Sequence, residues 1–237
     1  MKNLFCFLIV SLCAHVGSAQ YSQYFMPPVD EGLVMTAKEV YAITTAGDSV
    51  AGRINSAVMM GGQIRSLTIK KADKSKVKLK AADVKLLAVK ATDFMNWTSA
   101  MSAPNIARVA DMDYQKIMKR EWILFDQARL PKKDKYALMQ LLNPDFCSKI
   151  KVYVNPNANE TMTSSLNGVM LAGGEDTSYL VVTDGDQAEI YKKRKYKNEA
   201  LTRLFKNCET FKEEYAGEKF KWKDFSEHVL VYDQLCN

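Results

Sequence analysis

Two short alternating runs decide the fold, namely Arg65-Ser66-Leu67-Thr68-Ile69 and Lys76-Val77-Lys78-Leu79-Lys80. Successive side chains on a β-strand point to opposite faces, so each run places apolar residues on one face and polar residues on the other. The polar stretch 71–75 is a turn between them, and we therefore expect a β-hairpin. The residues expected on its buried face are Leu67, Ile69, Val77 and Leu79.

Similar hairpins are expected on both sides of this one. Upstream, the β-branched and aromatic run 40–45 turns at Ala46-Gly47-Asp48 into a second run, 49–54. Downstream, 178–183 and 187–192 flank Asp184-Gly185-Asp186, whose Asp-Gly pair is a strong hairpin signal. The remaining strands are expected over 86–89, 122–125, 136–142, 149–154 and, inside a long loop at 155–177, 169–171.

The periodicity then changes to that of helices. Apolar residues recur at helical spacing from Leu201 to Cys208, and a last helix runs from Phe225 to Cys236 with Asp224 as its N-cap. A further helix is expected after Pro104. Strands first and helices last predict an α+β fold, in which antiparallel β-hairpins form a sheet or sandwich followed by a helical C-terminal segment.

The N-terminus reads as a cleavable secretory signal over residues 1–19. Lys2 precedes an apolar run, and small residues precede a cut between Ala19 and Gln20. A lipoprotein signal at Cys13 or Cys6 is less favoured, because a bulky residue precedes each. We expect an irregular leader at 20–37 and one α+β domain at 38–237, mostly β over 38–193 and helical over 198–236. No later segment is apolar enough for a transmembrane helix.

Composition and charge narrow the partners. The 237-residue chain is 47% hydrophobic and 25% charged, which is typical of a globular protein. Its net charge of +6 falls by one when Lys2 leaves with the signal. This mild excess of positive charge favours an anionic glycan, a lipid surface or another envelope protein as partner. It is smaller than the positive charge typical of a nucleic-acid-binding protein. An exported protein of this kind acts in the periplasm, at the outer membrane or outside the cell.

Three cysteines remain after the signal is removed, so one of them stays unpaired. Cys208 and Cys236 both lie in the helical tail, and we expect them to form a disulfide. Cys147 is then the free thiol, and we expect it to be buried rather than reactive.

Two stretches resemble a large group of exported Bacteroidota proteins with no assigned activity. The first is Ala42–Ile54 with the Lys-rich hairpin and Ala82–Lys85 that follow it. The second is Leu204–Cys208 together with His228–Tyr232 and Cys236. The resemblance implies an envelope or secreted protein and brings no catalytic residues to this chain.

No catalytic, cofactor or metal site is predicted from the residues. His228 is the only histidine after the signal, and its place on an apolar helix face favours a hydrogen-bonded structural role. A Cys147–His228 dyad is the less favoured alternative. The acidic pairs Glu175-Asp176 and Asp184/Asp186 match no calcium loop.

Two basic features remain. One is the run between the last strand and the helices, with Lys192, Lys193, Arg194, Lys195 and Lys197, in which Tyr196 is a candidate for stacking on a sugar. The other is the lysine face of the second hairpin, formed by Lys70, Lys76, Lys78 and Lys80. Either set fits an anionic glycan or lipid surface, although lysines also serve to protect strand edges and solvate linkers.

The sequence therefore favours an exported envelope protein with a binding or structural role. The alternative is a secreted or periplasmic hydrolase that uses carboxylates or Cys147, which requires polar groups that converge on a pocket.

Overall fold

The computed structural model describes residues 24–102, 112–159, 164–166, 169–172 and 176–236. The expected signal and its cut between Ala19 and Gln20 lie outside these residues. So do residues 103–111, where the helix after Pro104 was expected to begin. In the described part of the chain, no helix is both long enough and apolar enough to cross a membrane.

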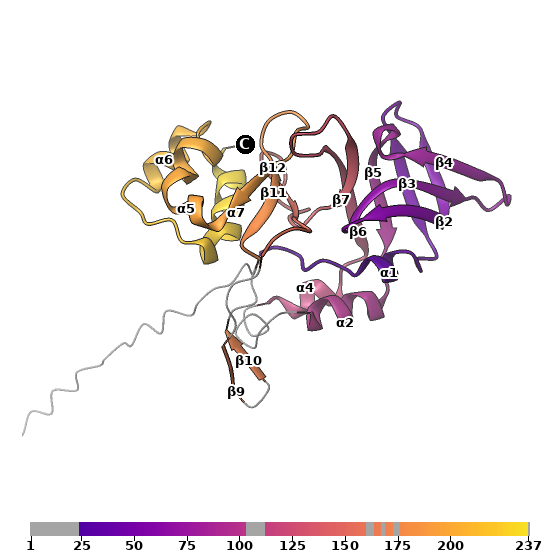
Figure 1. The fold of residues 1–237 in the computed structure, drawn as a ribbon, viewed down its shortest axis with the longest axis horizontal. Helices are drawn as coiled ribbons and strands as arrows, with labels where there is room; N and C mark the ends of the chain where they lie inside the picture. Colours follow the sequence, from indigo (N-terminus) through magenta and orange to yellow (C-terminus); the bar gives the residue numbers. More distant parts are fainter. Residues whose placement is uncertain (1–23, 103–111, 160–163, 167–168, 173–175, 237) are drawn as a thin grey trace, which may run out of the picture.

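Six antiparallel strands close into a β-barrel (Figure 1). Around the ring, each strand pairs with the next, and β2 returns to pair with β3. In ring order they are β2 (Ser49–Met60), β1 (Val40–Thr44), β5 (Val84–Lys90), β6 (Trp122–Arg129), β7 (Tyr136–Gln140) and β3 (Gln63–Lys70). Closure removes the exposed edges that an open sheet of this size would present.

Strand β3 makes the closure possible because it has different partners along its length. Its first two residues pair with β7, and Ser66 onward pairs with β4 (Lys76–Lys80), which lies outside the ring. At Gly52, β2 approaches its neighbour β3 so closely that a Cβ would lie 2.4 Å from the Lys70 carbonyl oxygen. Only glycine fits at that position.

The barrel core confirms the expected buried face of the β3–β4 hairpin. Leu67, Ile69 and Leu79 are buried, and Val77 is half-buried against the same cluster. A short 3-10 turn, Ala81–Asp83, then leads into β5. The alternation of apolar and polar residues was sufficient to predict this hairpin correctly.

A three-stranded sheet stands between the barrel and the C-terminal helices (Figure 1). Its order is β12 (Glu189–Lys192), β11 (Ser178–Val182) and β8 (Lys151–Val154). Tyr153, Leu180 and Val182 pack with residues of β6 and β7, whereas Tyr179 and Val181 pack with the helices. The predicted hairpin around Asp184-Gly185-Asp186 is confirmed, with Val181 opposite Glu189. In the expected long loop, β9 (Ser164–Leu166) and β10 (Val169–Ala172) form a separate pair.

The helical region begins earlier than expected. α5 (Lys193–Glu199) follows β12 directly and continues into a π-helical turn, Ala200–Leu204. The predicted boundary at residue 198, with a linker before it, was therefore wrong. α6 (Glu209–Glu214), a 3-10 turn (Trp222–Asp224) and α7 (Phe225–Leu235) complete the tail. Asp224 is the N-cap residue of α7, but its side chain makes no capping hydrogen bond.

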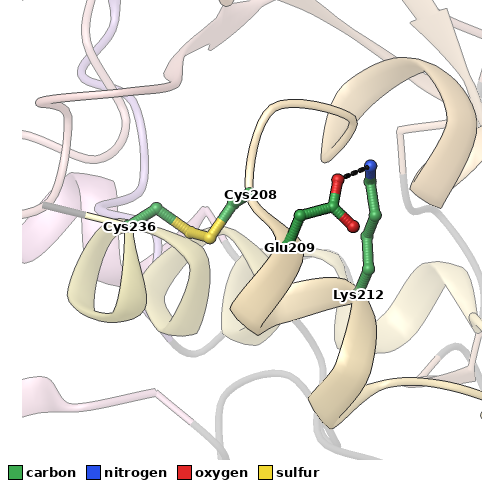
Figure 2. The surroundings of a disulfide bond; sticks show 4 residues. All are labelled: Cys208, Glu209, Lys212 and Cys236. Carbon is green, nitrogen blue, oxygen red and sulfur yellow. Dashed lines mark hydrogen bonds and ion pairs between the residues drawn. A yellow bond between two sulfur atoms is a disulfide. The ribbon is translucent and has the colours of Figure 1, made fainter.

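The expected disulfide is present (Figure 2). Cys208 precedes α6 and Cys236 follows α7, so the bond joins the two helices across a sequence separation of 28 residues. Beside it, the Lys212 ammonium donates to the Glu209 carboxylate at 2.6 Å.

The expected irregular leader is part of the core. Its residues include α1 (Glu31–Val34), and Phe25, Val29 and Val34 are buried. The expectation that organisation starts at residue 38 was therefore wrong for residues 24–37. The leader passes beside α2 (Asp93–Met101) and α4 (Tyr114–Met118), where the half-buried Arg120 donates to the Pro27 carbonyl oxygen at 2.9 Å.

Candidate functional site

A concavity of about 530 Å³ opens beside edge strand β12 and the start of α5. Three cations that the sequence singled out lie together in its wall, and no acidic side chain of the described residues lines it. Its lining residues are Asn155, Asn157, Asn159, Thr177, Ser178, Ile190, Lys192, Lys193 and Arg194. We refer to it below as the basic concavity.

The backbone fixes the place of the three cations. Lys192 is the last residue of β12 and lies opposite Ser178 of β11. Lys193 begins α5, and its N–H donates to the Thr177 carbonyl oxygen at 2.8 Å. All three cationic residues are exposed, and none forms an ion pair with a residue that the structure describes. Their charges are therefore available to an anion that enters the concavity.

The opposite rim is a loop held by hydrogen bonds. The buried Asn155 side chain donates to the Ser178 hydroxyl at 2.8 Å and accepts from the Asn157 N–H at 3.1 Å. The Asn159 carbonyl oxygen accepts from both the N–H and the hydroxyl of Thr177, at 2.8 and 2.6 Å. The amides and hydroxyls of this rim are thus positioned before any ligand binds, which lowers the entropic cost of binding.

The other two basic residues of the predicted set do not line the concavity. Lys195 pairs with Glu199 one helical turn away at 3.1 Å, and Lys197 is exposed outside the lining. The structure thus divides the five predicted residues into three that share a surface and two that do not.

Tyr196 does not stack on a ligand. Its side chain is fully buried, and its hydroxyl lies 2.5 Å from Nδ1 of His228. The expectation that Tyr196 could bind a sugar was wrong, because the helical turn directs it inward between Lys195 and Lys197. Ile190, which is 40% exposed, supplies apolar surface in the concavity instead.

His228 has the structural role that was expected. It is buried among the rings of Tyr215, Phe220 and Tyr196. Burial lowers the pKa of its imidazole to about 4, so the ring is neutral near neutral pH. The neutral ring and the Tyr196 hydroxyl share one hydrogen bond, in which the imidazole tautomer decides which group donates.

Cys147 has the properties of an unreactive thiol. It is free and half-buried, and burial raises its pKa, which disfavours the nucleophilic thiolate. It packs with the cluster between barrel and sheet, whereas His228 lies among the aromatic rings on the helix side of that sheet. The structure does not bring the two together as a dyad.

The described acidic residues among those weighed for metal binding do not converge. Asp184 lies 3.8 Å from Lys206, and Asp186 is bound by Arg129 and Tyr136. The Asp176 carbonyl oxygen accepts from the Trp222 indole, and Glu175 lies outside the described residues. Among the residues with described positions, no group of three or more His, Cys, Asp or Glu side chains is placed to hold a metal ion.

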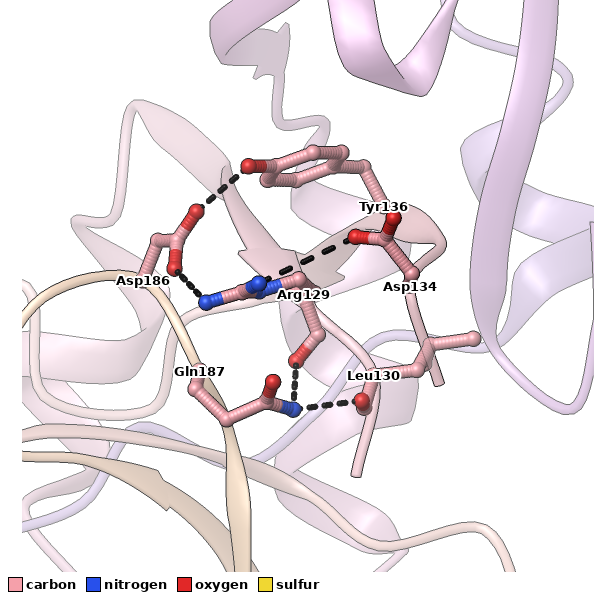
Figure 3. A network of polar contacts seen from close by, with 6 residues as sticks. All are labelled: Arg129, Leu130, Asp134, Tyr136, Asp186 and Gln187. Atoms are coloured by element: carbon pink, nitrogen blue, oxygen red, sulfur yellow. Dashed lines mark hydrogen bonds and ion pairs between the residues drawn. The ribbon is translucent and has the colours of Figure 1, made fainter. Parts of the chain in front are cut away.

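Asp186 instead anchors a polar junction (Figure 3). Its carboxylate accepts from Arg129 at 2.9 Å and from the Tyr136 hydroxyl at 2.5 Å, and these bonds lower its pKa. The adjacent Gln187 side chain donates to the Leu130 carbonyl oxygen at 2.5 Å. These contacts join the β6–β7 hairpin of the barrel to the β11–β12 loop, so this acidic pair serves the architecture.

The lysine face of the second hairpin offers a weaker alternative surface. A shallower hollow of about 440 Å³ includes Lys70 but none of Lys76, Lys78 and Lys80, which are exposed along β4. Its lining sets one acid, Glu39, among five cationic residues, which are Lys38, Arg53, Lys70, Lys71 and Lys74. The asparagine rim of the basic concavity has no counterpart there.

Comparisons with protein-family models, with curated proteins and with solved structures found no match.

Proposed function

We propose that this protein is exported to the bacterial envelope or beyond it and binds an anionic glycan in the basic concavity. The observation that carries the proposal is the composition of that surface. Three cations without ion-pair partners among the described residues face a rim of positioned amides and hydroxyls, and none of the described acidic residues lines the space between.

This combination suits an acidic sugar chain. Carboxylate or sulfate groups attract Lys192, Lys193 and Arg194, and a guanidinium can hold such a group through two parallel hydrogen bonds. Amide and hydroxyl groups such as those of Asn157 and Thr177 pair with sugar hydroxyls. A concave wall can contact a segment of a sugar chain on several sides. A flat array of lipid headgroups cannot enter a concavity in this way.

Export is supported by two independent features. The N-terminal run has the order of charged, apolar and small residues that defines a secretory signal. The Cys208–Cys236 disulfide belongs to the class of bond that persists in oxidising compartments.

The test compares two triple charge reversals of equal size in the protein without residues 1–19. Lys192→Glu/Lys193→Glu/Arg194→Glu changes the basic concavity, and Lys76→Glu/Lys78→Glu/Lys80→Glu changes the exposed β4 face. Binding to polygalacturonate, to neutral dextran and to vesicles containing phosphatidylglycerol is measured by calorimetry at low ionic strength.

We expect wild type and the β4 variant to bind polygalacturonate, the concavity variant to lose binding, and dextran not to bind. Equal losses in both variants would show that net charge alone attracts the polymer and would refute the site. Tighter binding to the vesicles than to the polysaccharide would replace the glycan with a lipid surface as the partner.

A further inference from the structure

A second cavity, of about 360 Å³, opens at one end of the barrel, where α1 and the β2–β3 turn meet the loop after β8. We call it the barrel-end pocket. Apolar side chains that contribute to its walls are Val29, Val34, Met59, Phe125 and Met139. Its volume falls within the range of about 300–1,000 Å³ that is usual for small-molecule sites, and barrel mouths are a common place for them.

Two buried glutamines give this apolar pocket hydrogen-bond donors. The amide oxygen of Gln140 accepts from the Val29 N–H at 3.2 Å, and that of Gln63 accepts from the Arg65 guanidinium at 2.8 Å. Because each oxygen is engaged, each NH₂ group is the end left to donate. Among the described residues, the Gln63 NH₂ has one weak acceptor, the Met139 sulfur at 4.0 Å.

Two carboxylates at the start of α1, those of Asp30 and Glu31, are also part of the lining. Neither forms an ion pair with a residue that the structure describes. Glu31 lies close to the β2–β3 turn, since a Cβ on Gly62 would lie 3.3 Å from its Oε1, and the Asp30 carboxylate accepts from the Gly32 N–H at 2.8 Å. The acidic charge is therefore fixed beside the apolar walls.

The two cavities have opposite charge although one loop separates them. Val154 and Pro156 line the barrel-end pocket, while Asn155, Asn157 and Asn159 line the basic concavity. A ligand suited to one cavity is thus disfavoured by the other.

From these features we propose that the barrel-end pocket is a second binding site, which takes a small amine with an apolar body. The apolar body packs against Met59, Phe125 and Met139, and the ammonium group lies at Asp30 and Glu31. A hydroxyl or carbonyl oxygen on such a molecule accepts from Gln140. This site is independent of the glycan site, and its failure would leave that proposal unaffected.

The experiment uses octylamine, octanol and octanoate, which share one tail and differ in the charge of the head. Binding is followed by NMR of ¹³C-methyl methionine in the protein without residues 1–19. Met59 and Met139 report on the pocket, and the exposed Met60 and Met101 report on non-specific contact. Met59→Trp fills the pocket, while Met60→Trp, at the exposed next position, is its matched control.

We expect octylamine to shift the Met59 and Met139 methyls saturably, and Met59→Trp but not Met60→Trp to abolish this. Glu31→Gln should lower the affinity for octylamine by about threefold, the effect expected from the loss of one partly exposed charge pair. The triple reversal in the basic concavity should leave octylamine binding unchanged. The proposal would be overturned if no saturable shift were seen or if octanoate bound with equal affinity. It would also be overturned if the largest shifts were those of the Met60 and Met101 methyls.

Discussion

The phenol of Tyr153 donates a hydrogen bond of 2.8 Å to Oδ2 of Asp126 and thereby joins the small sheet to the barrel wall. The Lys151 ammonium reaches the same oxygen at 2.7 Å. Asp126 points outward from β6, and both partners come from β8. A single buried carboxylate therefore connects β6 to β8, in addition to the apolar packing between barrel and sheet and the junction around Asp186.

Replacing this carboxylate should show how much its polar contacts, as distinct from apolar packing, contribute to the free energy of unfolding. Asp126→Asn keeps the shape and removes the charge, so the ion pair with Lys151 is lost and the Tyr153 hydroxyl has at best a neutral amide oxygen as its acceptor. We expect a loss of about 2–3 kcal/mol in the free energy of unfolding, below the usual cost for a fully buried pair because Lys151 is partly exposed. Urea denaturation measures it.

Asp134→Asn is the control for that change. Asp134 also faces an arginine, at 3.8 Å, but its side chain is 94% exposed. Its replacement should change stability by no more than about 0.5 kcal/mol. Similar effects of the two substitutions would contradict the role given to Asp126.

The disulfide should make a large contribution to the stability of the helical tail. Cross-linking residues 28 apart is worth about 3.5 kcal/mol in the chain-entropy model. Cys208→Ala/Cys236→Ala should lower the midpoint of thermal unfolding and abolish its response to reductant. Cys147→Ser should keep that response, and a reductant-dependent midpoint in the double variant would rule out this assignment.

The hairpins of the barrel could be predicted because their side chains alternate along the chain. Leu67, Ile69 and Leu79 are separated by polar residues, and that pattern is compatible with one buried face only. Helix α2 could not be recognised in this way. Its buried positions include Asn96, whose amide donates to the Arg120 carbonyl oxygen at 2.8 Å, so hydrogen bonding replaces the apolar signal.

Only part of the candidate site could be predicted from the sequence. The cations were recognisable as a run, but that run was interpreted as a linker because five of its residues are charged. Which of them would share a surface depends on where α5 begins. The asparagine rim lies far from them in sequence and reaches them through Thr177 and Ser178, a juxtaposition that only the strand pairing reveals.

The rim itself leads to a prediction on affinity without a change in charge. Asn155→Ala removes the bonds to Ser178 and Asn157 that hold the loop. We expect the affinity for polygalacturonate to fall about fivefold, which corresponds to about 1 kcal/mol. Asn198→Ala, on the exposed surface of α5, is the control. An unaltered affinity in Asn155→Ala would mean that the rim does not take part in binding.

His228 should make stability depend on pH in a defined window. Its pKa is about 4 in the folded protein and about 6.5 in an unfolded chain, so the unfolded state binds more protons between these values. The free energy of unfolding should therefore decrease as the pH falls from about 6.5 to about 4, by about 2–3 kcal/mol in total. Above this window the imidazole is neutral in both states, and its contribution is constant.

His228→Gln isolates this effect, since a glutamine oxygen can accept from the Tyr196 hydroxyl but does not titrate in the window. Urea denaturation of both proteins at several pH values from 7 to 4 gives the two profiles. Carboxylates with lowered pKa, such as Asp186 and Glu199, also reduce stability at acidic pH, but they do so equally in both proteins. The difference between the profiles is thus due to residue 228. Parallel profiles would show that the imidazole titrates alike in the folded and unfolded states, contrary to its burial among aromatic rings.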